Sequence, residues 1–207
     1  MQRHDRINND MTWRLPWVSS LDPDFDDNLT TPLQFGQSES ETAMLSSEQL
    51  AEYRENGFTL VPDFLTPVQT AALQEEVLRL KREGKLQNIS TEGDGTTHSS
   101  KAQNLQICPA SPHSEVLRAL PFSDSVREVV GQILDGPSRQ ILDQIFLKPA
   151  HYGAGTNWHQ DNAYFKTEHP LLGVGMWIAV HAATLENGTM HMARGLQHTA
   201  LPHYRDP

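Results

Sequence analysis

Residues 45–77, LSSEQLAEYRENGFTLVPDFLTPVQTAALQEEV, contain two helix-start signals and decide the first half of the fold. Ser46 and Gln49 have the spacing of a capping box, in which each residue bonds the backbone N–H of the other. Gly57 supplies a helix stop, so a short helix is predicted between Ser46 and Gly57. The next residues, 58–61, are rich in strand formers and are predicted to be extended.

The second start signal is the run Thr66-Pro67-Val68-Gln69, which combines a cap, a proline in the first helical turn and a glutamine that closes a second capping box. After it, Leu73, Val77 and Leu80 recur at the i, i+4, i+7 spacing of a helix with one apolar face. Gly84 ends this pattern, which therefore predicts an amphipathic helix from about Thr66 to Gly84.

Strands are predicted mainly in the second half of the chain. A loop rich in Gly, Ser and Thr (87–100) precedes them, and a third helix runs from Ser123 to a Gly136-Pro137 stop. The predicted strands are KAQNLQI (101–107), RQILDQIFLK (139–148) and VGMWIAVHAAT (174–184). Helices first and strands later predict the α+β class with an antiparallel sheet.

Residues 1–45 differ from the rest in composition and have no sustained periodicity. They hold eight acidic and three basic residues, and so carry half of the chain's net charge of -10. We expect a loosely ordered acidic arm over 1–45 and one folded domain over 46–207.

The composition excludes several classes of protein. An acidic chain with no basic stripe argues against nucleic acid and against an anionic membrane surface as partners. No apolar run reaches the length of a membrane span, and the N-terminus MQRHDRINND has no apolar signal-peptide region. The single cysteine, Cys108, excludes an internal disulfide framework, so a cytoplasmic location is predicted.

His159 and Asp161 are the centre of the functional prediction. On an extended segment, residues i and i+2 point to the same side, so an imidazole and a carboxylate there can hold one metal ion. A third protein ligand would complete the 2-His-1-carboxylate arrangement of non-haem Fe(II) oxygenases. Taken alone, a His-x-Asp sequence is also explained by two solvated side chains on a strand.

The chain resembles the phytanoyl-CoA dioxygenase family of Fe(II)/2-oxoglutarate oxygenases from about Ser46 onward. The resemblance rests on residues 45–77 and on five later motifs in the same order: KAQNLQ (101–106), FLKPA (146–150), WHQDNAYF (158–165), W-x-A (177–179) and Glu-Asn-Gly (186–188). It implies a double-stranded β-helix, or jelly roll, with the N-terminal helices packed on one side.

The same resemblance implies iron ligands and cosubstrate contacts. His159 and Asp161 inherit the roles of two iron ligands, and the presence of Asp161 implies hydroxylation rather than halogenation. Lys101, Gln144 and Trp177 match positions that contact 2-oxoglutarate, although the family has a different side chain at the place of Gln144. A surface lysine and a core tryptophan are the alternatives for Lys101 and Trp177.

The implied cofactors and partners are Fe(II), 2-oxoglutarate, O2, ascorbate as a candidate reductant, and a small-molecule substrate. Acyl-CoA thioesters, small amino-acid derivatives and secondary metabolites are all open as substrates, and the oligomeric state is open too. Asn162 and Tyr164 follow the metal pair and are candidates to face the substrate.

The chain departs from the family pattern at its end. The family's second iron histidine and the arginine that pairs with 2-oxoglutarate come after the Glu-Asn-Gly turn, and no matching pair occurs here. The expectation is therefore a C-terminally truncated member, with weak iron binding unless His191, His198 or His203 replaces the missing ligand. The alternative functions are a non-catalytic jelly-roll binding module and, more remotely, a cupin-like metal site.

Overall fold

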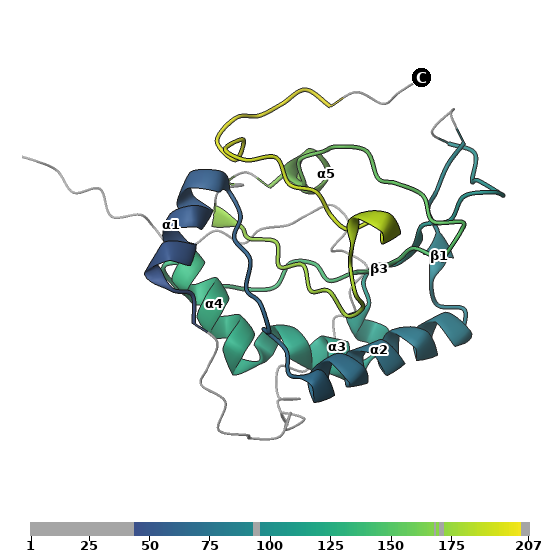
Figure 1. Ribbon diagram of the computed structural model, residues 1–207, viewed down its shortest axis with the longest axis horizontal. Helices are drawn as coiled ribbons and strands as arrows, with labels where there is room; N and C mark the ends of the chain where they lie inside the picture. Colours follow the sequence, from purple (N-terminus) through teal and green to yellow (C-terminus); the bar gives the residue numbers. More distant parts are fainter. Residues whose placement is uncertain (1–43, 93–95, 168, 170–171, 204–207) are drawn as a thin grey trace, which may run out of the picture. The chain divides into compact units, whose positions relative to one another are not determined.

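The computed structural model describes residues 44–92, 96–167, 169 and 172–203 (Figure 1). The predicted arm lies outside these residues except for its last two positions. The helices are α1 (Ser47–Asn56), α2 (Pro67–Arg82), α3 (Glu115–Ala119), α4 (Asp124–Leu134) and α5 (Asn162–Phe165). The strands are β1 (Gln87–Asn88), β2 (Leu105–Ile107) and β3 (Ile145–Leu147), and three short 3-10 turns are η2 (Ser111–His113), η3 (Leu120–Phe122) and η5 (Leu185–Asn187).

Both predicted capping boxes are confirmed. The Ser46 hydroxyl accepts from the Gln49 N–H at 3.2 Å, and the Gln49 side chain accepts from the Ser46 N–H at 2.9 Å. Thr66 and Gln69 repeat this arrangement at the start of α2. Gly57 ends α1 with φ +85°, a left-handed conformation that glycine adopts without steric cost. These local interactions fix where α1 and α2 begin and end.

The core lies on the predicted apolar face of α2. Leu73 and Leu80 are almost fully buried, and Val77 lies between them on the same face. The other buried apolar residues among those described are Leu45, Ile107, Ala110, Val126 and Val129. Leu45 is also held by polar contacts, since its N–H donates to the Gln132 side chain on α4 at 2.8 Å.

The sheet has the order β1-β2-β3, and both pairings are antiparallel. Leu105 lies opposite Leu147, and Ile107 lies opposite Ile145, so the apolar side chains share one face. The α+β class is therefore confirmed. The predicted strands 101–107 and 139–148 shorten to three residues each, and Asp143, just before β3, accepts from the N–H groups of Ala110 and Ser111 instead of lying in the ladder.

Two segments of strand-forming composition pair with no neighbouring strand in the described residues, so the strand predicted at 174–184 is wrong. Residues 58–61 form no ladder, because side chains of α1 bond this segment instead; Gln49 donates to the Leu60 carbonyl at 2.7 Å. Residues 174–184 form no ladder either, and the Val180 carbonyl accepts from the side chain of Gln74 on α2. With one three-stranded sheet in the described part of the chain, the jelly roll stays a prediction.

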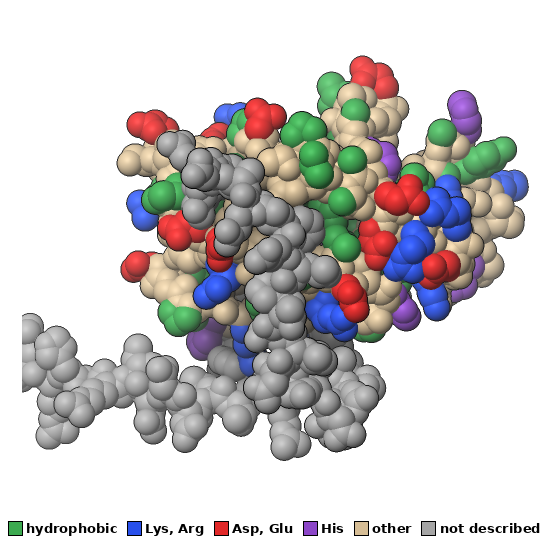
Figure 2. All heavy atoms as spheres, turned by 90° about the horizontal axis from the view of Figure 1, so that it is seen from below, with side chains coloured by type: hydrophobic (Ala, Val, Ile, Leu, Met, Phe, Trp, Pro, Cys, Tyr) green, Lys and Arg blue, Asp and Glu red, His purple; other side chains and the backbone are tan. Residues whose placement is uncertain are grey.

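The exposed side of α2 carries paired charges. Arg79 contacts Glu76 and Glu83 at 2.7 Å each, and Arg82 contacts Glu75 at 2.6 Å. The hydrogen bond from Arg79 lowers the pKa of Glu76 below its ordinary value. Figure 2 shows acidic and basic side chains interspersed on this side of the molecule. None of the helices described is long and apolar enough to cross a membrane.

The burial of α2 leads to a stability prediction. Replacing Leu80 by alanine should lower the free energy of unfolding in urea by about 2–5 kcal/mol, because the side chain is fully buried and leaves a cavity. The matched control is Leu78→Ala on the same helix, where the residue is 38% exposed and the expected loss is about 1 kcal/mol or less. Equal losses in the two variants would contradict the assigned core face.

The capping boxes lead to a second prediction. Thr66→Ala removes the hydroxyl that caps α2 and should cost about 1 kcal/mol of unfolding free energy, measured by urea denaturation. Thr70→Ala makes the same change inside the helix and should alter stability by about 0.5 kcal/mol or less. A Thr66→Ala variant as stable as the wild type would show that the box does not stabilise the helix start.

Candidate metal and cosubstrate site

His159 and Asp161 lie beside each other just before α5. The distance from His159 Nε2 to Asp161 Oδ1 is 3.4 Å, and the His159 side chain is 31% exposed. The pair is not on a strand: Asp161 has φ -52° and ψ -37° and starts the helical turn of α5. The expectation of an extended segment is corrected here, because a turn brings the two side chains together rather than strand alternation.

The hydrogen bonding of His159 determines which ring nitrogen is free. Nδ1 lies 2.7 Å from the Asn157 carbonyl oxygen, which only accepts, so Nδ1 carries the proton in this contact. In a neutral ring, Nε2 then presents a lone pair toward the Asp161 carboxylate. A metal ion placed between Nε2 and the carboxylate could be bound by both atoms.

The spacing fits a shared metal ion. Two ligand atoms bound to one ion at about 2.1 Å stand roughly 3.0–3.4 Å apart, depending on the angle between them. The Nε2–Oδ1 distance of 3.4 Å lies at the upper end of this range. A ring nitrogen and a carboxylate oxygen are also ligands that ferrous iron accepts. The pair therefore fits two positions of an iron site.

Residues around the pair restrict its movement. The Tyr164 ring packs edge-on against the His159 ring, with centroids 5.3 Å apart and planes at 87°. The Asn162 side chain accepts from the Thr167 N–H at 2.7 Å and so closes the α5 turn, which is a structural use of this candidate substrate residue. A Cβ at Gly175 would lie 3.6 Å from Asp161 Oδ2, so the 174–180 segment runs beside the carboxylate.

No third protein ligand is found near the pair in the part of the chain that the structure describes, where no group of three or more His, Cys, Asp or Glu side chains has a metal-binding arrangement. Of the candidate replacements, His203 accepts the Gln160 N–H through Nε2 at 2.7 Å, so that nitrogen is occupied. His191 packs edge-on against Trp158 with ring centroids 6.3 Å apart.

The hydrogen bonds of the three predicted cosubstrate residues do not involve the pair. Lys101 is exposed, and its backbone N–H donates to the Ser99 hydroxyl at 3.2 Å. Gln144 accepts from Gln106 on the neighbouring strand at 3.0 Å, and Trp177 is 51% exposed. Within the described residues, no hydrogen bond, ion pair or ring contact joins any of the three to His159 or Asp161.

A contact that the sequence did not predict joins two of the motifs. Lys148 Nζ donates to the Gly188 carbonyl at 3.2 Å and so connects the FLKPA segment to the Glu-Asn-Gly turn. Within that turn, a hydrogen bond from Thr184 lowers the pKa of Glu186. The two motifs lie 40 residues apart and share no helix or strand, so the spacing of the sequence does not predict this contact.

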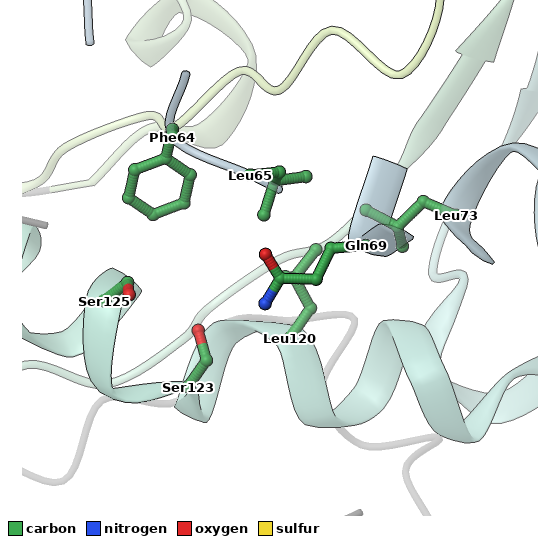
Figure 3. A pocket seen from close by; sticks show the side chains of 7 residues that line it. All are labelled: Phe64, Leu65, Gln69, Leu73, Leu120, Ser123 and Ser125. Carbon is green, nitrogen blue, oxygen red and sulfur yellow. The ribbon is translucent and has the colours of Figure 1, made fainter. Parts of the chain in front are cut away.

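The hollows between helices lie away from this site. One of about 30 Å³ lies between the start of α2, η3 and the start of α4 and has room for about one water molecule (Figure 3). An open groove of about 550 Å³ is lined by residues of α2, η2 and α3, including Glu76, Arg79 and Arg118. Neither is lined by a predicted site residue.

Comparison with known proteins gives the family. Residues 53–203 match the sequence profile described as Phytanoyl-CoA dioxygenase (PhyH). Phytanoyl-CoA dioxygenase domain-containing protein 1 of Mus musculus is 24% identical over 191 residues, covering 74% of this chain and 66% of that protein. L-proline trans-4-hydroxylase of Streptomyces griseoviridis is 28% identical over 155 residues, covering 72% of this chain and 54% of that protein.

The matched region covers a larger share of this chain than of the two relatives. The chain spans 54% to 66% of the length of these two proteins. No solved structure is significantly similar to it. Because the family profile covers residues 53–203, from α1 to the last described residue, the resemblance drawn from the motifs is confirmed: the chain belongs to the phytanoyl-CoA dioxygenase family.

Proposed function

We propose that this chain carries part of the catalytic centre of an Fe(II)- and 2-oxoglutarate-dependent dioxygenase that hydroxylates a small organic or acyl substrate. The observation that carries the proposal is the convergence of His159 Nε2 and Asp161 Oδ1 at 3.4 Å. Family membership supports the same reaction class, and L-proline trans-4-hydroxylase is a relative whose name states hydroxylation of a small amino acid.

In this proposal the chain's own residues prepare two ligand positions. The Asn157 carbonyl holds the His159 proton on Nδ1 and leaves Nε2 to bind the metal. The Tyr164 ring limits rotation of the imidazole, and the Asp161 carboxylate supplies negative charge that partly neutralises the ion. A bound ferrous ion would supply the oxidative chemistry, which couples decarboxylation of 2-oxoglutarate to succinate and CO2 with hydroxylation of a substrate C–H bond.

The cosubstrate roles belong to the same proposal. 2-Oxoglutarate is a dianion, so the Lys101 ammonium group is suited to one of its carboxylates. Trp177 would form an apolar wall and Gln144 a polar contact. In the described residues, no hydrogen bond, ion pair or ring contact joins these three side chains to the pair, so we propose that the jelly-roll arrangement of the family brings them to it. O2 and a small-molecule substrate are the proposed partners, with ascorbate as the reductant that keeps iron ferrous.

A second candidate is a non-catalytic binding module of the same family. It is favoured by one observation: the described residues contain no third protein ligand. Succinate release separates the two candidates. With Fe(II), 2-oxoglutarate and a panel of acyl-CoA thioesters and amino acids, succinate formation that depends on Asp161 supports the dioxygenase. Metal binding without any succinate supports the binding module.

The pair predicts how divalent metal binding responds to mutation. Mn²⁺, a redox-stable substitute for Fe(II), should bind weakly to the wild type, since two protein ligands are available, and His159→Ala or Asp161→Asn should weaken binding about tenfold or more. The measurement is titration of free Mn²⁺ by electron paramagnetic resonance.

The matched control for this titration is His113→Ala, which removes an exposed histidine of the same chain that is neither in the pair nor a candidate replacement ligand. Its Mn²⁺ affinity should equal that of the wild type. Equal affinity in all four proteins would show that Mn²⁺ binds elsewhere and would contradict the assignment of the pair.

A further inference from the structure

Residues 195–203, called the strap below, are fixed at one end to the C-terminus of α1. The Gly195 N–H donates to the Asn56 carbonyl at 2.9 Å. The Gln197 side-chain amide donates to the carbonyls of Arg54 and Glu55 at 3.0 and 3.3 Å. These are last-turn carbonyls, which have no partner within a helix, so the strap supplies the donors that α1 lacks.

The approach of the strap to α1 is close. A Cβ at Gly57 would lie 2.8 Å from Gln197 Oε1 and 3.1 Å from Gln197 Cβ, so the Gln197 side chain would have to shift to admit it. Gly57 therefore suits this position through its positive φ at the helix end, and its lack of a side chain leaves room for Gln197. This contact joins the first helix of the domain to a segment about 140 residues later in the chain.

The other end of the strap is fixed to Gln160, which lies between His159 and Asp161. Gln160 Nε2 donates to the Thr199 carbonyl at 2.7 Å and to the Leu196 carbonyl at 3.2 Å. Gln160 Oε1 accepts from the Leu201 N–H at 2.9 Å. Both donor hydrogens and the acceptor of this one amide are therefore used by the strap.

The backbone of Gln160 is held by the same segment. Its N–H donates to His203 Nε2 at 2.7 Å, while His203 Nδ1 lies 2.8 Å from the Leu201 carbonyl. Figure 1 shows the strap, in yellow, passing alongside α5 and reaching the end of α1. The residue between the two proposed ligands is thus bonded through its side chain and its backbone to one segment.

We propose that Gln160 is a positioning residue that sets the relative direction of the His159 and Asp161 side chains by binding the strap. The metal-related part of this inference rests on the proposed function, in which these two residues are ligands. With Gln160 fixed on both sides, the backbone on either side of it cannot turn freely, so the ring and the carboxylate keep the spacing that one ion needs.

The test uses the whole chain without metal and two spectroscopic signals. Gln160→Met keeps the size of the side chain and removes all three amide hydrogen bonds. Hydrogen exchange of the Leu201 amide should become about tenfold faster. The NMR signals of the His159 ring should shift as well, because its edge-on contact with the Tyr164 ring at 5.3 Å produces a ring-current shift that depends on geometry.

Three further variants separate positioning from general loss of structure. Gln160→Glu keeps the acceptor for the Leu201 N–H but turns a second oxygen toward the Thr199 and Leu196 carbonyls, so Leu201 exchange should rise by less than in Gln160→Met. Gln197→Met releases the α1 end and should speed exchange of the Gly195 amide, with Leu201 little changed. Gln140→Met, whose amide bonds only the nearby Leu142 carbonyl at 3.4 Å, should change neither signal.

Unchanged Leu201 exchange in Gln160→Met would overturn the proposal, and so would faster exchange with unchanged His159 ring signals, because the strap would then be held without positioning the pair. If Gln160→Met loses structure throughout, Gln160→Glu becomes the test. Leu201 exchange as fast in Gln160→Glu as in Gln160→Met would then overturn the proposal. Since metal is absent from these measurements, their outcome is independent of whether the pair binds Mn²⁺.

Discussion

Side-chain amides hold together the half of the chain that carries the proposed metal ligands. Gln160, Asn162, Asn187 and Gln197 each bond two or more backbone groups. In the described residues of this half, the regular elements are few and short, so most backbone N–H and C=O groups have no ladder partner. Here the side-chain amides, which both donate and accept, bond backbone groups that no ladder pairs.

The proposed site follows from this arrangement. A turn that Asn162 closes brings Asp161 toward His159, and the Asn157 carbonyl accepts the proton of the ring. Gln160, the residue between the two, is bonded to the strap. The result is a pair of lone pairs that face one another across 3.4 Å in a partly exposed position. An imidazole nitrogen and a carboxylate oxygen at this spacing can both bind one cation, which is the physical basis of the proposed metal site.

The helices could be predicted from the sequence because their determinants are local. Ser46, Thr66 and Gly57 act on residues within one or two turns, and the Leu73–Leu80 face follows from helical period alone. The proximity of His159 and Asp161 is local too, although a turn rather than a strand produces it. Strand composition at 58–61 and 174–184 was misleading, because a strand also needs a hydrogen-bonding neighbour and neither segment has one among the described residues.

The rest of the site depended on contacts far apart in sequence. The partners of the Gln160 side chain lie 36 to 41 residues downstream, and Gln197 reaches back 143 residues to Arg54. Neither glutamine stands out by spacing or composition. Lys101, Gln144 and Trp177 were carried over from the family pattern, and bringing them to one cosubstrate requires an arrangement of strands that local sequence signals do not specify.

The most direct test of the account is paramagnetic broadening of the amide NMR signals by substoichiometric Mn²⁺. The competing place for a divalent ion is the acidic stretch DPDFDD at residues 22–27. The account predicts that the signals of residues 157–164 broaden first, with His159 and Asp161 at the centre of the effect. First broadening at residues 22–27, with 157–164 unaffected, would contradict the claim that the imidazole and carboxylate together bind the metal.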